Sequence, residues 1–146
     1  MKLEIKLDPA QAEPRLTLTA AELTPQLQEL IRRLEGELPP PIPGWQGEQA
    51  VLLEQWDILR CCTAGQKVLA QTAQGEYILR LRLYELEEQL DRRRFVRVSN
   101  SEIVNLKAVT ALDLSLSGTI KMTLSNGAVV YVSRRYVKRI KQAVGL

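Results

Sequence analysis

The spacing of apolar residues changes along the chain, and the change predicts two structural parts. Over residues 25–36 apolar side chains recur three and four positions apart, which indicates one apolar stripe along a helix. The residues of this stripe are Leu27, Leu30, Ile31 and Leu34. From residue 48 onward the dominant period is two, which is typical of half-buried strands. The pattern therefore predicts a mainly β domain preceded by a small α/β segment.

Residues 1–38 form the predicted N-terminal segment. Strict alternation of apolar and polar residues predicts a half-buried strand over residues 2–7, with residues 15–18 as a candidate partner strand. Thr24 followed by proline is typical of a helix start, and Gly36 of a helix end. Such a small segment cannot bury an independent core. We therefore expect its apolar stripe to pack on a second copy of the chain, in an oligomerisation or sensing role.

A proline-rich run follows this segment. Its sequence PPPIPG over residues 39–44 cannot form a helix and is a poor strand, and it favours a polyproline conformation. We predict a semi-rigid linker over residues 39–47 and a folded domain over residues 48–146.

The domain after the linker is predicted to contain short strands joined by turns. The predicted strands cover residues 51–53, 57–61, 67–73, 76–83, 95–98, 112–116, 120–124 and 128–132. Helices are predicted over residues 84–90 and after Ser133, and residues 103–106 are predicted to form a buried turn or helical fragment. The Asn126-Gly127 pair predicts a hairpin with a type I′ turn, which requires positive φ at both residues.

Composition favours a protein without catalysis. The 146 residues are 45% apolar and 25% charged, which is ordinary for one globular domain with a small appendage. The sequence has no histidine, which excludes mixed Cys/His zinc sites and histidine-based catalysis, and no acidic cluster has a spacing suited to catalysis. The adjacent Cys61 and Cys62 are expected to pack as small apolar residues. We expect no enzyme, metal, cofactor or small-molecule substrate.

The apolar pattern contains no targeting signal. No stretch approaches the roughly 18 consecutive apolar residues that a membrane helix needs. The first residues alternate in charge and lack the apolar core of a signal peptide. A cytoplasmic protein is therefore expected.

Charge is distributed unevenly along the chain. Residues 92–146 contain eleven Lys and Arg against two acidic residues, a net charge of +9, whereas residues 1–91 have a net charge of −6. The total of +3 conceals this difference. A strongly basic third of a chain is the expected docking surface of a polyanion.

One segment of this basic third has side chains suited to base recognition. Arg97, Asn100 and Ser101 leave a predicted strand and enter a turn. Arginine pairs with guanine, and asparagine with adenine, in the major groove of DNA. The alternative interpretation is that Asn100 and Ser101 only cap the following turn through bonds to the backbone.

A second segment is the start of the final helix. Arg134 and Arg135 lie in its first turn, where each positive charge opposes the helix dipole by a few tenths of a kcal/mol. This placement favours an external anion at the helix start. The alternative is that both arginines pair with acidic residues in the first part of the chain. Lys138, one turn later, is expected to contact phosphates; the alternative is that it only complements the helix dipole, as cations in later turns do.

The motifs of residues 48–146 resemble the LytTR DNA-binding domain of bacterial transcription regulators. The resemblance rests on YELEEQL, on FVRVSNSEIVNL, on the strands with Leu112/Leu114 and Ile120/Met122, and on SNGAVVYVSRRYVKRIK. It implies stacked antiparallel sheets with small helices rather than a helix-turn-helix. It also implies that loops enter successive major grooves on one face of the DNA and bend the duplex.

The resemblance also implies positions for base contacts. The family's base-proximal positions correspond to Gln66 with Lys67 beside it, to Asn100 and to Arg135. This chain has Ser99 where the family often has histidine. The loop that contains Gln66 has small, uncharged side chains before Lys67, so the expected contact there moves toward Lys67. The chain resembles the short regulators of the family that lack a receiver domain. Some of these are encoded beside a small membrane protein, which is therefore a candidate partner.

The sequence thus predicts a DNA-binding transcription regulator that reads the major groove of double-stranded DNA as a homodimer. Two alternatives remain: an RNA-binding or ribosome-associated module, and a non-catalytic interaction protein with a basic docking face. RNA binders usually stack bases on exposed aromatic side chains. The chain has seven aromatic residues, of which Phe95, Tyr131 and Tyr136 are predicted to face inward, so RNA is disfavoured.

Overall fold

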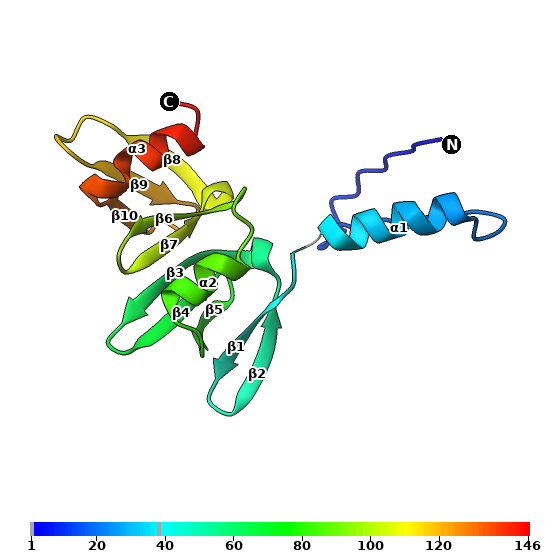
Figure 1. Ribbon diagram of the computed structural model, residues 1–146, viewed down its shortest axis with the longest axis horizontal. Coiled ribbons are helices and arrows are strands. Elements are labelled where there is room, and N and C mark those ends of the chain that lie inside the picture. Colours follow the sequence, from blue (N-terminus) through cyan, green and yellow to red (C-terminus); the bar gives the residue numbers. More distant parts are fainter. Residues whose placement is uncertain (1, 38) are drawn as a thin grey trace. The chain divides into compact units, whose positions relative to one another are not determined.

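The computed structural model describes residues 2–37 and 39–146, and the chain divides into two compact units, Met1–Glu37 and Leu38–Leu146 (Figure 1). The first unit contains helix α1 (Pro25–Glu37). The second contains all the strands found in the described part of the chain. None of the described helices is both long and apolar enough to cross a membrane.

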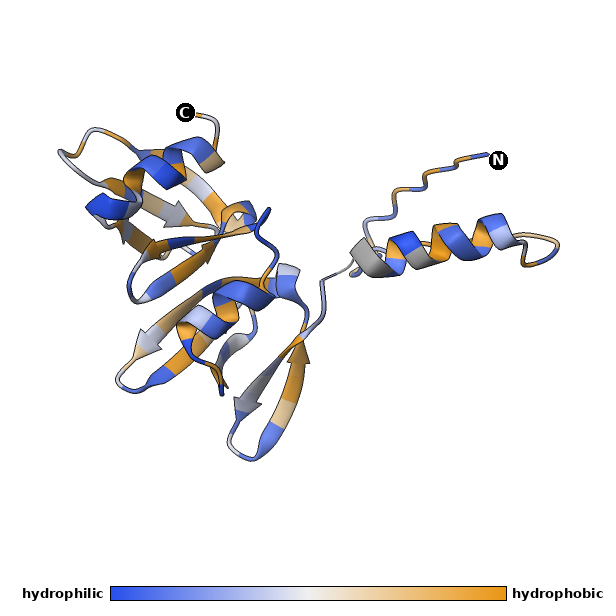
Figure 2. Ribbon diagram, viewed as in Figure 1, coloured by the Kyte–Doolittle hydropathy of each residue, from blue (hydrophilic) through white to orange (hydrophobic). Residues whose placement is uncertain are grey.

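Helix α1 confirms the predicted helix and its start. The Oγ1 atom of Thr24 accepts a hydrogen bond from the backbone N–H of Leu27 at 3.2 Å, so Thr24 is the N-cap. The helix continues through Gly36 and ends at Glu37, one residue beyond the predicted end. Apolar and polar bands alternate along α1 in Figure 2, as the predicted stripe requires.

The predicted strand over residues 2–7 is wrong, and so is its candidate partner over residues 15–18. Both segments are irregular, and Leu3, Ile5 and Leu7 are 87%, 75% and 92% exposed. An alternating segment is stable as a strand only when neighbouring strands complete its hydrogen bonds and cover its apolar face. The described residues of the first unit contain no such neighbour.

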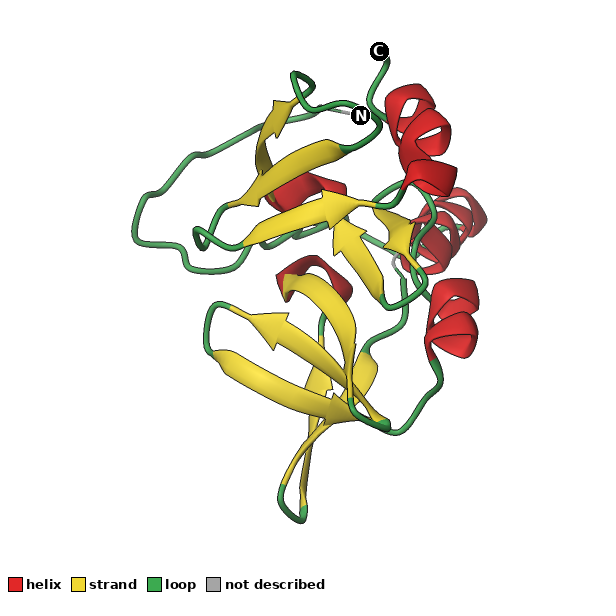
Figure 3. Cartoon of the chain, turned by 90° about the vertical axis from the view of Figure 1, so that its left-hand side faces the viewer, coloured by secondary structure: helices red, strands yellow, loops and turns green. Residues whose placement is uncertain are grey.

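The second unit contains two antiparallel sheets with small helices, which confirms the predicted mainly β fold (Figure 3). The seven-stranded sheet has the order β2-β1-β5-β4-β3-β7-β6, and the three-stranded sheet has the order β10-β9-β8. The first sheet comprises β1 (Ile42–Gln46), β2 (Gln49–Leu53), β3 (Ile58–Ala64), β4 (Lys67–Thr72), β5 (Gly75–Leu79), β6 (Phe95–Ser99) and β7 (Glu102–Asn105). The second comprises β8 (Val109–Asp113), β9 (Ile120–Leu124) and β10 (Val129–Val132). Helix α2 (Leu83–Gln89) precedes β6, helix α3 (Arg134–Ala143) follows β10, and 3₁₀ turns cover Gln55–Asp57 and Leu106–Ala108.

Strand β1 begins inside the proline-rich run, so the prediction that residues 39–44 are poor strand is wrong from Ile42 onward. The strand pairs with β2 along its whole length, but with β5 only through Trp45 and Ile78. Pro43 therefore lies where β1 is paired on one side only, and a missing N–H is tolerated there. Ile42 is fully buried in the domain core and anchors the strand.

Strand β7 replaces the buried turn or helical fragment that was predicted over residues 103–106. Only Leu106–Ala108 is helical, as a 3₁₀ turn. Ile103 and Val104 are adjacent and point to opposite faces, and they are 1% and 0% exposed. A strand that is covered on both faces has no alternating pattern, so periodicity could not identify it.

The turns of the three-stranded sheet differ in detail from the prediction. A β9–β10 hairpin forms at Asn126-Gly127 as predicted, but Gly127 has a φ of 84° and none of the described non-glycine residues has a positive φ, which excludes a type I′ turn. The N–H of Gly127 donates to the carbonyl oxygen of Leu124 at 2.9 Å, as in a type I turn followed by glycine. Strand β8 ends at Asp113, three residues before its predicted end.

Two buried clusters hold the domain together, and the β6–β7 hairpin contributes to both. Ile103 belongs to the cluster formed with β3, β4, β5 and α2, whereas Val104 belongs to the cluster formed with β9, β10 and α3. Phe95 and Val98 of β6 divide between the two clusters in the same way. The hairpin is therefore the layer that the two cores share.

The two cysteines pack as small apolar residues, as predicted. Both are free, with Cys61 buried in the first cluster and Cys62 half-buried. Burial raises the pKa of the Cys61 thiol far above its ordinary value, so this group stays protonated and unreactive.

Gln55 is a buried polar residue that ties three segments of the domain together. Its side chain is 0% exposed. Its amide nitrogen donates to the carbonyl oxygens of Pro40 at 2.9 Å and Gln89 at 3.1 Å, and its amide oxygen accepts from the N–H of Asp91 at 2.9 Å. The entry to β1, the 3₁₀ turn and the end of α2 are thus joined through one side chain.

Replacing Gln55 by leucine should destabilise the domain by about 2–4 kcal/mol, because two carbonyls and one N–H lose their partner while the volume is retained. Urea denaturation measures this loss. Gln89→Ala is the control, because Gln89 contributes only its backbone carbonyl; it should change the free energy of unfolding by less than about 0.5 kcal/mol. Equal losses in the two variants would contradict the assigned role of Gln55.

Candidate nucleic-acid interface

Three segments from different parts of the sequence meet at one end of the seven-stranded sheet, on the left in Figure 1. They are the β3–β4 turn, the β6–β7 turn and the start of α3. The N–H of Thr63 donates to the carbonyl oxygen of Ser101 at 2.9 Å, and the N–H of Ser133 donates to that of Val98 at 2.8 Å. These backbone bonds join the β6–β7 hairpin to the end of β3 and to the residue before α3.

Asn100 and Arg135 lie side by side at this end of the sheet. The side-chain oxygen of Asn100 accepts from Nη1 of Arg135 at 3.4 Å and from the hydroxyl of Tyr136 at 3.3 Å. Asn100 and Arg135 are both exposed, and the Arg135 guanidinium lies 5.3 Å from the centre of the Tyr136 ring. An amide and a guanidinium are thus presented together to solvent, and these groups pair with adenine and guanine edges.

The β6–β7 turn is capped by Ser99 rather than by Asn100 or Ser101. The Oγ of Ser99 accepts from the N–H of Ser101 at 3.2 Å and lies 3.2 Å from the Ser101 hydroxyl. The alternative interpretation of Asn100 as a local cap is therefore wrong. Its side chain is directed toward α3 instead.

Arg97 holds the turn from inside, which contradicts the prediction that it projects outward with the base-reading residues. Its Nε and Nη2 atoms donate to the carbonyl oxygens of Ser99 and Asn100, both at 2.7 Å, and its Nη1 lies 2.8 Å from the carboxylate of Glu87. The side chain is only 13% exposed. The forked guanidinium matches two carbonyls and one carboxylate, so β6 buries the arginine against its own turn.

The start of α3 presents the predicted cations to solvent. Arg134, Arg135 and Lys138 are exposed, and within residues 2–37 and 39–146 neither arginine of this helix start forms an ion pair. The described contacts therefore give no support to the alternative that they pair with acidic residues in the first part of the chain. Ser133 is the N-cap residue, but its side chain makes no capping bond. The first turn of α3 keeps the concentration of positive charge that the sequence indicates.

Gln66 lies in the exposed β3–β4 turn, and Lys67 is the exposed first residue of β4. Gly65 precedes them with a φ of 64°, a left-handed conformation that glycine adopts readily. The turn lies at the same end of the sheet as the β6–β7 turn because β3 pairs with β7. Neither side chain has a hydrogen bond to the pair formed by Asn100 and Arg135 among the described contacts.

Glu102 is one of the two acidic residues in the basic third of the chain, and it lies two residues from Asn100. Its carboxylate lies 3.2 Å from Nη1 of Arg60. Burial raises the pKa of Glu102, and the neighbouring Arg60 opposes that shift. The ion pair offsets this negative charge close to the exposed turn.

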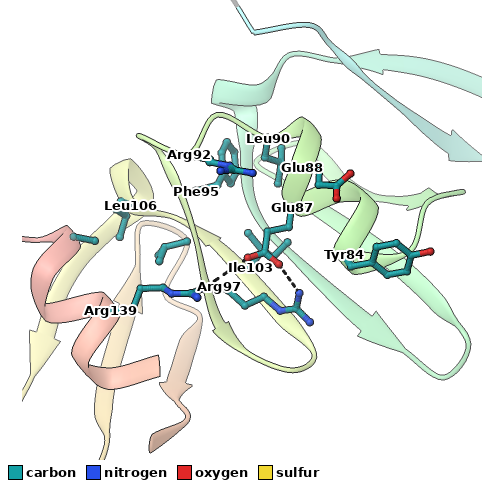
Figure 4. Close-up of a pocket in the computed structure, with 12 residues that line it drawn as sticks. Tyr84, Glu87, Glu88, Leu90, Arg92, Phe95, Arg97, Ile103, Leu106 and Arg139 are labelled. Atoms are coloured by element: carbon teal, nitrogen blue, oxygen red, sulfur yellow. Dashed lines mark hydrogen bonds and ion pairs between the residues drawn. The ribbon is translucent and has the colours of Figure 1, made fainter. Parts of the chain in front are cut away.

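A cavity of about 540 Å³ lies behind the exposed residues, between α2, β6 and α3 (Figure 4). Apolar side chains such as Phe95 and Ile103 line it, together with charged groups. Across it the Glu87 carboxylate lies 2.8 Å from Arg97 and 3.7 Å from Arg139 of α3. Glu87 is therefore paired with two arginines, although its side chain is 40% exposed.

Sequence reasoning missed Glu87, Tyr136 and Arg139 as parts of this interface. The spacing of four residues between Arg135 and Arg139 indicates one face of a helix and could have joined that pair. No local pattern connects Glu87 with α3, because the two are far apart in sequence. Tyr136 was expected to face inward; it is half-buried, with its hydroxyl directed to Asn100.

Comparison with known proteins gives a consistent result. The family model described as the LytTr DNA-binding domain matches residues 48–145. HTH-type transcriptional regulators of Staphylococcus aureus strains MSSA476 and MW2 are each 30% identical over 147 residues, covering 100% of this chain and 99% of the relative. The similarity therefore includes the first unit as well as the β domain.

The fold also matches a solved structure, the LytTr DNA-binding domain of a Bacillus cereus protein. The TM-score is 0.70 at 19% sequence identity, and the match covers 73% of this chain and 98% of that chain. At this identity the likeness concerns the arrangement of strands and helices.

Proposed function

This chain belongs to the LytTR DNA-binding domain family and is a DNA-binding transcriptional regulator, and we propose from this premise that it reads the major groove through two turns and the start of α3. Asn100 and Arg135 make the base contacts, and Gln66 or Lys67 reaches the duplex from the β3–β4 turn. Ser101, Arg134 and Lys138 contact the sugar–phosphate backbone. Arg97 acts indirectly, by holding the turn.

One observation carries this proposal: Asn100 and Arg135 come from segments 35 residues apart and meet at an exposed edge. A purely electrostatic surface would not need this pairing, because phosphate attraction depends on charge and not on the juxtaposition of an amide with a guanidinium. A pair of this kind is suited to neighbouring base edges.

The proposal does not involve a helix-turn-helix, although the Staphylococcus aureus relatives carry HTH-type in their names. The described helices α1, α2 and α3 are separated from one another by strands. Reading through turns at the end of a sheet fits this order of elements. Because the proposed target is DNA, we propose that the protein acts in the bacterial cytoplasm.

RNA binding remains the weaker alternative. Tyr131 is 58% exposed on β10, so the expectation that it faces inward is wrong. Phe95 is buried, however, and Tyr136 is half-buried and bonded to Asn100. The interface therefore presents an amide and guanidinium groups rather than a row of stacking rings.

We also propose that the first unit mediates homodimerisation, matching two copies of the domain to paired half-sites. Leu3, Ile5, Leu7 and Leu16 are each at least 74% exposed, and a unit of this size cannot cover them alone. A second copy supplies an identical apolar surface, as expected for a twofold interface. A small membrane protein is the alternative partner for the same surface.

Selection of bound duplexes from a random pool, at two salt concentrations, tests the DNA-binding proposal. A recurring sequence should be enriched at both, because base contacts survive the salt that weakens phosphate attraction. Single-stranded RNA and heparin should compete poorly at the higher salt. Absence of any enriched sequence, or equal competition by all polyanions, would contradict sequence-specific recognition.

Arg135→Ala and Lys138→Ala should have different effects on the selected duplex. Arg135→Ala should weaken its binding by about 1–3 kcal/mol and relax discrimination at one base position. Lys138→Ala should weaken selected and unrelated duplexes about equally and lower the salt slope by about one. Titrations of both duplexes at several salt concentrations separate the two outcomes. Equal losses of discrimination would remove the distinction between reading and anchoring residues.

Removal of residues 1–38 should convert the dimer into a monomer and shorten the footprint on DNA to one half-site. Sedimentation velocity of both chains measures the change. The shortened chain should begin at Pro39, because a later start removes the buried Ile42 and the carbonyl of Pro40 that Gln55 binds. An unchanged oligomeric state would exclude dimerisation through the first unit.

A further inference from the structure

The carboxylate of Glu87 lies between two arginines that belong to different parts of the interface. Its Oε2 is 2.8 Å from Nη1 of Arg97 on β6, and its Oε1 is 3.7 Å from Nη1 of Arg139 on α3. Figure 4 shows the three side chains converging from α2, β6 and α3. Each oxygen of one carboxylate thus faces a different element.

Arg97 extends this contact to the β6–β7 turn. Its guanidinium is planar, so the bond to Glu87 and the two bonds to the carbonyls of Ser99 and Asn100 constrain one another. The Arg97 side chain is 13% exposed and that of Glu87 is 40% exposed, so the bond is partly shielded from solvent and is stronger than one on an open surface. Glu87 therefore restrains the backbone on which Asn100 is mounted.

Arg139 extends the contact to α3. It lies one helical turn after Arg135, and its guanidinium is 5.5 Å from the centre of the Tyr136 ring. The Tyr136 hydroxyl in turn donates to the side-chain oxygen of Asn100 at 3.3 Å. Two routes thus lead from Glu87 to Asn100, one through the backbone of the turn and one through α3, and together they form a closed ring of contacts.

Helix α2 provides a rigid anchor for this ring. Leu83, Leu86 and Leu90 are at most 6% exposed and belong to the first core, whereas Ile140 anchors α3 in the second core. Glu87 therefore links a helix anchored in the first core to a helix anchored in the second, close to the point where Asn100 and Arg135 meet.

We propose that Glu87 is a positioning residue for base recognition, which sets the placement of Asn100 relative to Arg135. This inference rests on the proposed function. It accounts for an acidic residue behind a basic interface, where its charge opposes the attraction of DNA. Its removal should release the two arginines, strengthen attraction to any duplex and weaken discrimination between duplexes.

Glu87→Gln tests this inference, with Glu88→Gln as the matched control. Glu88 is the next residue of α2 and is exposed, its substitution changes the net charge equally, and it makes no ion pair among the described contacts. The measured quantity is the ratio of the dissociation constants for an unrelated duplex and for the selected duplex. Glu87→Gln should lower this ratio at least about fivefold, the lower end of typical coupling between sites. Glu88→Gln should change it less than about twofold, while both variants bind the unrelated duplex at least as tightly as the parent chain.

A second measurement separates positioning from general destabilisation. Amide hydrogen exchange at Asn100 and Ser101 should accelerate in Glu87→Gln relative to amides of the core strands, at a temperature where both variants are folded. If Glu87→Gln does not fold, Arg139→Gln interrupts the same ring from α3 and should lower the same ratio. A ratio that stays within twofold of the parent in the folded variant would overturn the inference. Failure of the parent chain to prefer any duplex would instead overturn the proposed function.

Discussion

The structure depends on a hairpin that is buried on both faces. In β6–β7, Ile103 packs into one core and Val104 into the other, and Phe95 and Val98 divide in the same way. A shift of one residue in strand register would exchange these faces and place each apolar side chain in the wrong core. Two cores therefore determine where the tip of this hairpin lies. Asn100 is located at that tip, so the position of this proposed base-reading residue follows from packing on both sides of the strand that precedes it.

The interface separates affinity from discrimination. The concentration of basic residues after Arg92 provides attraction to any phosphate backbone, and it does not depend on exact placement. Discrimination between sequences requires that donors and acceptors meet particular base edges, and this depends on placement. In the function that we propose, the acidic groups behind the interface serve the second requirement. Glu102 is paired with Arg60, and Glu87 lies between Arg97 and Arg139, so each negative charge joins elements of the interface while it reduces the net attraction.

Periodicity predicted the elements whose burial is one-sided. Helices α1 and α2 and the β4–β5 hairpin have one apolar face, and their patterns identified them, although β5 ends at Leu79 and not at residue 83 as predicted. Strand β7 is buried on both faces, and β1 contains Pro43, so the pattern misassigned both. The alternation over residues 2–7 indicates a strand only if a neighbouring strand exists, which a local pattern cannot establish.

Residue chemistry identified Asn100 as a base-reading candidate and Arg135 as an anion-binding one, and the resemblance to the LytTR family made Arg135 a base-reading candidate as well. It could not identify the role of Arg97. That role depends on Glu87 and on two backbone carbonyls that approach only in the folded chain, and the same holds for the bond from Tyr136.

The hydrogen bonds of Asn100 are long, 3.3 and 3.4 Å, and lie at an exposed edge, so they are weak. In the proposed function, weak contacts of this kind orient the side chains before binding, and little is lost when a base edge replaces them. The strong restraints act on the backbone of the turn, where Arg97 makes both of its carbonyl bonds at 2.7 Å. The backbone of the turn is firmly held, which lowers the entropy lost on binding. The side chains of Asn100 and Arg135 are held only weakly, which leaves these proposed base-reading groups available to DNA.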